Sequence, residues 1–105
     1  MIDLSRMLRH LAWADAKLFD DLLALPAEAL GARYADSAWA VGQLATHIVG
    51  GAEWYRYCLT GTPESDLVPR DFAPDALKAH VLALRGHLGA LDALLLEQVA
   101  RPDEV

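Results

Sequence analysis

The apolar positions of the chain follow three long patterns that have the period of an α-helix. In the first, from Asp3 to Leu25, leucines recur at alternating intervals of four and three residues. Pro26 ends this pattern, because proline lacks the backbone N–H that a helix needs. The stripe consists of Leu4, Leu8, Leu11, Asp15, Leu18, Leu22 and Leu25.

The second pattern begins after Trp39 and ends at Leu59. The third begins at Pro74, a residue favoured at the first position of a helix, and fades at residues 101–102. The two stripes are Val41, Leu44, Ile48, Gly51, Tyr55 and Cys58 in the second helix, and Leu77, Val81, Leu84, Leu88, Leu91 and Leu95 in the third. We expect each stripe to face the other helices.

The fold class predicted from these patterns is all-α. Ala and Leu account for 38 of the 105 residues and Val, Ile and Thr for 11, a balance that favours helix over sheet. Loops over residues 27–38 and 60–73 are long enough for consecutive helices to pack antiparallel. Without a repeat or a shift in composition, the sequence predicts one domain, 1–105, built as an up-down antiparallel bundle of three long helices.

Charge and cysteine content exclude several classes of function. The formal net charge is −6 and the nine basic residues form no cluster, so we expect no nucleic-acid partner. No run approaches the ~18 uncharged apolar residues of a membrane span, so we expect no membrane partner. Cys58, the single cysteine, cannot form an intrachain disulfide. An acid at position 3 with no apolar run after it argues against a signal peptide, and we expect a cytoplasmic protein.

Four histidines are the main candidates for chemistry. His80 and His87 share a helix face, but seven residues place them about 10 Å apart, too far for one metal ion with ligand bonds of ~2.1 Å. His47 lies one turn before two glycines and on the same face as Trp54. It is either a hydrogen-bonded bystander or a residue with room for a ligand above it. Glu53 lies ~240° around the helix from His47 and does not join it.

Asp15 is a carboxylate within the leucine stripe of the first helix. In an antiparallel hairpin of the first two helices it lies within about a turn of His47, and His87 lies at a similar level. A buried carboxylate needs a partner, so Asp15 either pairs within the bundle or reaches solvent at a place where the helices do not pack closely.

Two segments of the chain resemble the DinB-like family of metal-dependent four-helix bundles. They are Met7-Leu-Arg-His-Leu-Ala-Trp-Ala-Asp15-Ala-Lys-Leu18 and Val41-Gly-Gln-Leu-Ala-Thr-His47-Ile-Val-Gly-Gly-Ala-Glu-Trp-Tyr55. The resemblance implies a divalent metal, zinc or nickel, held by three histidines, of which His47 matches the one from the second helix. It also implies a relation to thiol-dependent transferases or isomerases, although many such proteins have no known activity.

The chain departs from the family pattern at the two remaining ligands. They come as His-x-x-x-His from a fourth helix, and this sequence contains no such motif. We therefore expect a DinB-like protein whose metal triad is incomplete and whose catalytic activity is in doubt. The alternatives are a non-enzymatic interaction or dimerisation module, and a metal enzyme whose rearranged site uses His47, Asp15 and His87. Because a missing fourth helix leaves apolar faces of the first and third helices uncovered, we also expect a homodimer.

Overall fold

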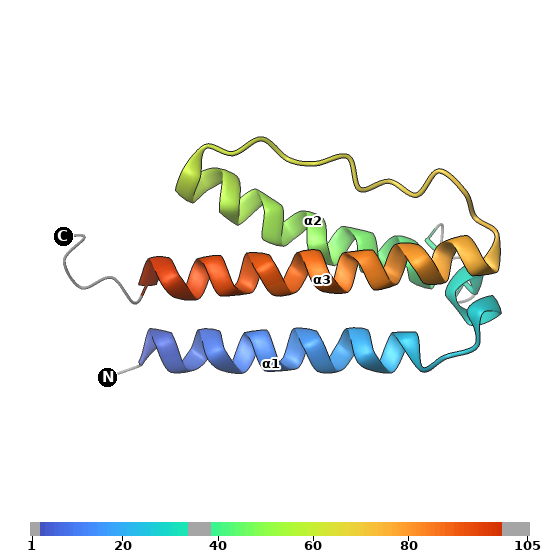
Figure 1. Ribbon diagram of the computed structural model, residues 1–105, viewed down its shortest axis with the longest axis horizontal. Coiled ribbons are helices and arrows are strands. Elements are labelled where there is room, and N and C mark those ends of the chain that lie inside the picture. The colour runs from blue at the N-terminus through green and yellow to red at the C-terminus, as the bar shows by residue number, and fades with distance from the viewer. Residues whose placement is uncertain (1–2, 34–38, 100–105) are drawn as a thin grey trace.

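The computed structural model describes residues 3–33 and 39–99. Its elements are α1 (Leu4–Leu23), a short 3₁₀ helix η1 (Ala27–Gly31), α2 (Val41–Thr60) and α3 (Pro74–Val99) (Figure 1). The all-α helical bundle predicted from the sequence is confirmed.

Local interactions explain where the helices begin and end. The Asp3 side chain accepts a hydrogen bond from the Arg6 backbone N–H and so caps α1. At the start of α2, Ala40 has no capping side chain, but its own N–H donates to Gln43 Oε1 at 2.8 Å. The end of α2 is Gly61, whose φ of 72° lies in the left-handed region that favours glycine.

The central helix is α3, which packs against both α1 and α2 (Figure 1). Thr46 contacts His80 and Glu53 contacts His87, so partners in α2 and α3 keep a constant separation of 34 residues. A constant separation means that α2 and α3 run parallel. The expected up-down order therefore holds between α1 and α2, whereas α3 runs in the same direction as α2.

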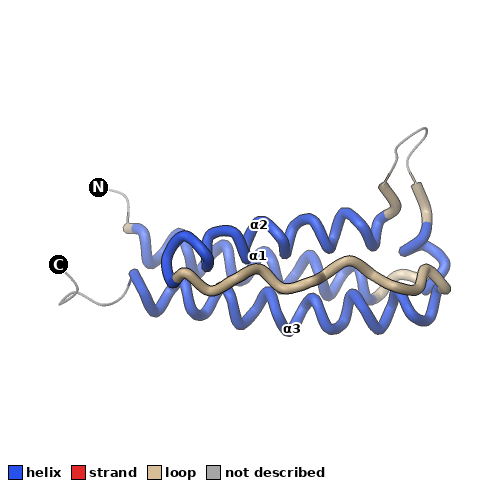
Figure 2. The backbone as a smooth tube through the Cα atoms, turned by 90° about the horizontal axis from the view of Figure 1, so that it is seen from above, coloured by secondary structure: helices blue, strands red, loops and turns tan. Residues whose placement is uncertain are grey.

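A long connection between α2 and α3 makes this parallel arrangement possible. Residues 61–73 contain no helix or strand and run along the length of the bundle (Figure 2). Thirteen extended residues span up to about 43 Å, whereas a 20-residue helix is only about 30 Å long. The connection can thus return the chain to the end of the bundle at which α2 begins. The sequence analysis instead expected this loop to reverse the chain, so that α3 would run antiparallel to α2.

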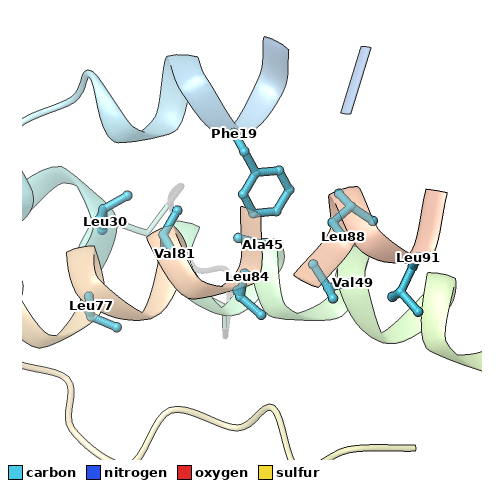
Figure 3. Packing of buried hydrophobic residues seen from close by; sticks show 9 residues of the cluster. All are labelled: Phe19, Leu30, Ala45, Val49, Leu77, Val81, Leu84, Leu88 and Leu91. Atoms are coloured by element: carbon cyan, nitrogen blue, oxygen red, sulfur yellow. The ribbon is translucent and has the colours of Figure 1, made fainter. Parts of the chain in front are cut away.

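The hydrophobic core is built on the predicted stripe of α3. Its residues Leu77, Val81, Leu84, Leu88 and Leu91 are buried. Phe19 reaches this stripe from α1, Leu30 from η1, and Ala45 and Val49 from α2 (Figure 3). Phe19, Leu30 and Val49 are fully enclosed, and each such side chain contributes about 1.5–3 kcal/mol by leaving water.

The stripes predicted for α1 and α2 behave differently from that of α3. Leu4, Leu11, Leu18 and Leu25 from the first stripe, and Leu44, Ile48 and Tyr55 from the second, are exposed. The core contacts of α2 come instead from Gly42, Ala45, Val49 and Glu53, one helix face further round. The helical periodicity was predicted correctly, but only Leu22 of the first stripe and Val41 of the second pack against the core, and most of both stripes has no helix of the same chain to cover it.

Among residues 3–33 and 39–99, α3 is also the one helix whose length and apolar composition would suffice to cross a membrane. This is weak evidence for a span, because the central helix of a helical bundle passes the same test. Asp92 and Arg85 lie within α3, and both interact with side chains of α1.

Candidate functional site

His47, the position that matches the family's metal ligand, is exposed on the outer side of α2. Its ring packs against Trp39 with the ring centroids 4.8 Å apart. Together with Val68 and Pro69 from the long connection, the two rings line a shallow hollow. His47 is therefore accessible to solvent and is held mainly by aromatic packing.

Asp15 and His87 do not join His47. The His87 ring contacts Glu53, and Asp15 interacts with Asp92 across the α1–α3 interface. The rearranged site suggested by the sequence is therefore wrong, because the side chains of His47, Asp15 and His87 do not lie together in the structure. The reason is the parallel packing of α2 on α3, which places Glu53 opposite His87 and leaves α1 on the other flank of α3.

The described part of the chain does not fit the metal centre that the resemblance implies. Within it, no three His, Cys, Asp or Glu side chains lie close enough together to hold one metal ion. A structural or catalytic zinc site needs three or four such ligands. His47 supplies one imidazole, and no chemical step through a metal follows from these residues.

Glu53 is the most deeply buried charged residue described, with 1% of its surface exposed. One carboxylate oxygen, Oε1, lies 2.5 Å from His87 Nε2, and the other accepts the backbone N–H of Ser65 at 2.6 Å. Arg56 Nη2 lies 3.6 Å from Oε1 and donates to the Pro63 carbonyl. A single carboxylate thus fastens α2, α3 and the long connection together.

Opposing effects act on the pKa of Glu53. Burial raises it, since a charge loses hydration in the interior, but the hydrogen bonds from Ser65 and His87 lower it. The net effect is a pKa below the ordinary value of 4.5, so Glu53 is ionised at neutral pH. Because an ionised carboxylate only accepts hydrogen bonds, His87 Nε2 carries the proton in this contact.

His80 lies seven residues before His87 on α3, and its ring is also held by a hydrogen bond to a side chain of α2. Thr46 Oγ1 donates its proton to the Gly42 carbonyl, so it accepts from His80 Nε2 at 2.9 Å. Burial lowers the pKa of His80 and keeps its ring neutral. Both rings are thereby oriented by α2, and both line an open cleft beneath residues 66–70 of the connection.

Asp15 and Asp92 form a pair of carboxyl groups between α1 and α3. Asp92 is 7% exposed, and its Oδ2 is buried. Burial, followed by hydrogen bonding with Asp15 and repulsion from its charge, raises the pKa of Asp92 to about 7. Asp92 is therefore mostly protonated below pH 7, and its hydrogen bond with Asp15 joins α1 to α3.

The uncovered apolar stripes of α1 and α2 border a groove on one side of the bundle. Leu11 from α1 meets Ile48, Tyr55 and Leu59 from α2 in the lining of a cavity that α3 closes with Leu88 and its neighbours. In a four-helix bundle this position belongs to a helix that packs between two others. The sequence analysis placed the uncovered faces on the first and third helices; the structure places them on α1 and α2, because α3 occupies the centre.

The fold and this groove define an all-α helical protein with one open side. A family model described as the DinB family matches residues 1–100. The chain therefore belongs to the DinB family, as the resemblance implied. Neither the curated proteins nor the solved structures contain a match to it.

Sequence reasoning missed Glu53 and Asp92. Glu53 was set aside because it lies on the far side of α2 from His47, yet that side is the one facing α3. Asp92 lies one position after Leu91 on the core face of α3, so its burial was visible in the heptad pattern. An acid beside the predicted core stripe of α3 was the signal that could have found Asp92, whereas the sequence carried no signal for Glu53, because the pattern did not show that this face of α2 meets α3.

Proposed function

We propose that this DinB-family chain acts as a helical interaction module, and that the groove between α1 and α2 binds a helix of a second copy. The observation that carries the proposal is the exposure of regularly spaced apolar side chains on the two helices that flank α3, namely Leu4, Leu11 and Leu18 on α1 and Leu44, Ile48 and Tyr55 on α2. Extended apolar faces of this kind mark interaction surfaces in soluble proteins. A homodimer buries these faces against a helix of a second copy, so no other partner is required.

Charge favours α1 as the element that pairs with its own copy. The first half of α1 contains Arg6 and Arg9 and no acid, whereas the second half contains three aspartates and Lys17. Antiparallel pairing about a two-fold axis sets the basic half of each α1 beside the acidic half of the other. Parallel pairing would set like charges together.

A working metal enzyme is the weaker candidate. The relation to metal-dependent thiol transferases rests on family membership, and zinc or nickel on His47 would need further donors from outside the described residues. The interaction module requires nothing beyond the surfaces that α1 and α2 present.

Sedimentation equilibrium at micromolar concentration tests the proposal with a matched pair of variants. Leu11→Glu places a charge on the exposed α1 leucine that lines the groove, and Leu82→Glu places the same charge on an exposed leucine of α3 outside the groove. We expect a dimer for the wild type and for Leu82→Glu, and a shift toward monomer of at least about 10-fold in dissociation constant for Leu11→Glu. A wild-type monomer of 11.4 kDa, or equal behaviour of the two variants, overturns the proposal.

A further inference from the structure

His87 has one ring nitrogen that the fold does not use. Its Nε2 donates to the ionised carboxylate of Glu53, so Nδ1 carries the free lone pair. Nδ1 has no hydrogen-bond partner in the described part of the chain, where the buried polar side-chain atoms without a partner are Arg56 Nε and Asp92 Oδ2. Since Nδ1 is not among these buried atoms, it is open to solvent.

His87 lines a cleft of about 440 Å³ between α3 and residues 66–70 of the long connection. Arg70 lines the same cleft, and its guanidinium makes no ion pair or hydrogen bond with the described residues. Asp66, the acid of this cleft, accepts the backbone N–H of Val68 in a local turn. A free imidazole nitrogen and an unpaired cation thus border one hollow, which favours a small substrate that carries negative charge.

The carboxylate of Glu53 makes His87 the more nucleophilic of the two histidines in this cleft. Glu53 is buried and fixed by the Ser65 amide, and a carboxylate behind an imidazole sets its tautomer and raises the basicity of the opposite nitrogen. His80 also lines the cleft, but its Nε2 is held by the Thr46 hydroxyl, and burial lowers its pKa. His80 is therefore an internal reference that lacks the carboxylate.

We propose that His87 is a phosphoryl-acceptor residue, whose Nδ1 takes the phosphoryl group of a small phosphoryl donor while Arg70 offsets the charge of that group. The Nδ1 lone pair attacks phosphorus and forms the new bond. The bond from phosphorus to the leaving group breaks, and its electron pair departs with that group. With phosphoramidate as the donor, the leaving group is ammonia. The Nε2 proton stays in the contact with Glu53, which stabilises the positive charge that the ring gains.

This inference goes beyond the proposed interaction module and does not depend on it. The cleft and the groove between α1 and α2 share no lining residue. Leu11→Glu should therefore dissociate the dimer and leave the phosphorylation of His87 unchanged. Loss of phosphorylation in this variant would contradict a site that one chain builds.

Incubation of the folded protein with phosphoramidate tests the proposal. Mass spectrometry assigns the modified residue, and phosphorus NMR distinguishes a phosphoryl group on Nδ1 from one on Nε2. We expect phosphorylation of His87 at Nδ1, at a rate at least about 10-fold above that of His80 and also above those of the exposed His10 and His47. Phosphorylation of His87 at Nε2, or a rate no higher than that of any of the other three, overturns the proposal.

A matched pair of variants tests the role of the guanidinium. Arg70→Gln should slow the phosphorylation of His87 about 3-fold, the effect of one exposed charge. Arg9→Gln removes an equal charge from an exposed position on α1 and should leave the rate unchanged. Equal rates in the two variants would contradict the role of Arg70.

Glu53→Gln tests whether the carboxylate activates the ring. The rate at His87 should fall at least about 10-fold, toward that of His80, in protein that circular dichroism shows to be folded. An unchanged rate would contradict activation by Glu53. If this variant does not fold, the comparison of His87 with His80 within the wild-type protein decides the proposal.

Discussion

At the scale of residues, the described interior combines leucines with a few acids whose environments differ sharply. Glu53 receives hydrogen bonds from Ser65 and His87, which keep it ionised. Asp92 faces another carboxyl group, which together with burial favours its protonated form. Glu53 therefore holds the connection on the bundle as an ionised acceptor, whereas Asp92 joins α3 to α1 in its protonated form.

Replacement of Glu53 by Gln should destabilise the fold by about 2–3 kcal/mol, because one amide oxygen cannot accept from both Ser65 and His87. Urea denaturation measures the loss, and hydrogen exchange at the Ser65 amide measures release of the connection. Glu64→Gln, an exposed neighbour, is the control. Unchanged stability together with unchanged exchange at Ser65 would show that Glu53 does not hold the connection.

The same variant has a defined pH dependence. The pKa of Glu53 is lowered by folding, so its contribution is fully present above its ordinary value of 4.5 and is lost as the pH falls through the lower folded value. The difference in unfolding free energy between wild type and Glu53→Gln should stay constant from pH 8 to 5 and shrink at more acidic pH. A difference that grows on acidification would contradict the account.

His47 should not hold zinc or nickel in stoichiometric amount, since one imidazole is far short of the ligands that such a site needs. Elemental analysis of protein purified without a histidine tag measures the content, with His47→Ala as the comparison. One metal ion per chain that is lost in His47→Ala would restore the metal-enzyme alternative.

At the scale of elements, helical periodicity predicted α1, α2 and α3 because Ala and Leu recur with the period of a helix and Pro26, Gly61 and Pro74 mark their limits. Periodicity did not reveal which face of each helix meets α3. On α2 the small residues Gly42 and Ala45 allow close approach to the core, so the bulkier stripe from Leu44 to Leu59 is turned outward.

The direction of α3 also could not be predicted from the local pattern of the sequence. A connection of thirteen residues can either reverse the chain or cross the whole bundle, and composition alone does not choose between them. The contacts of Ser65 with Glu53 and of Pro63 with Arg56 hold the connection along the bundle, and this sets the direction of α3. These contacts join residues that only the tertiary structure brings together, as do the pairs of Asp15 with Asp92 and of Glu53 with His87.

At the scale of the whole molecule, the three helices form a bundle with one open side. The core around α3 is closed, but α1 and α2 keep apolar faces in contact with solvent. In the dimer that we propose, a second copy would place its own α1 in the groove, bury these faces and pair the basic half of one helix with the acidic half of the other. The account therefore depends on contact between two α1 helices.

Disulfide crosslinking tests that contact most directly. In a Cys58→Ser background, Ala14→Cys places a thiol near the middle of α1, one turn from both Leu11 and Leu18, where a two-fold axis would bring it next to its copy. Ala16→Cys places a thiol on another side of the same helix. A disulfide forms only when the two Cβ atoms come within about 3.5–4.5 Å. We predict rapid oxidation of Ala14→Cys to a covalent dimer at micromolar concentration, and little crosslinking of Ala16→Cys. Equal crosslinking of both variants, or none of Ala14→Cys, would contradict pairing through α1.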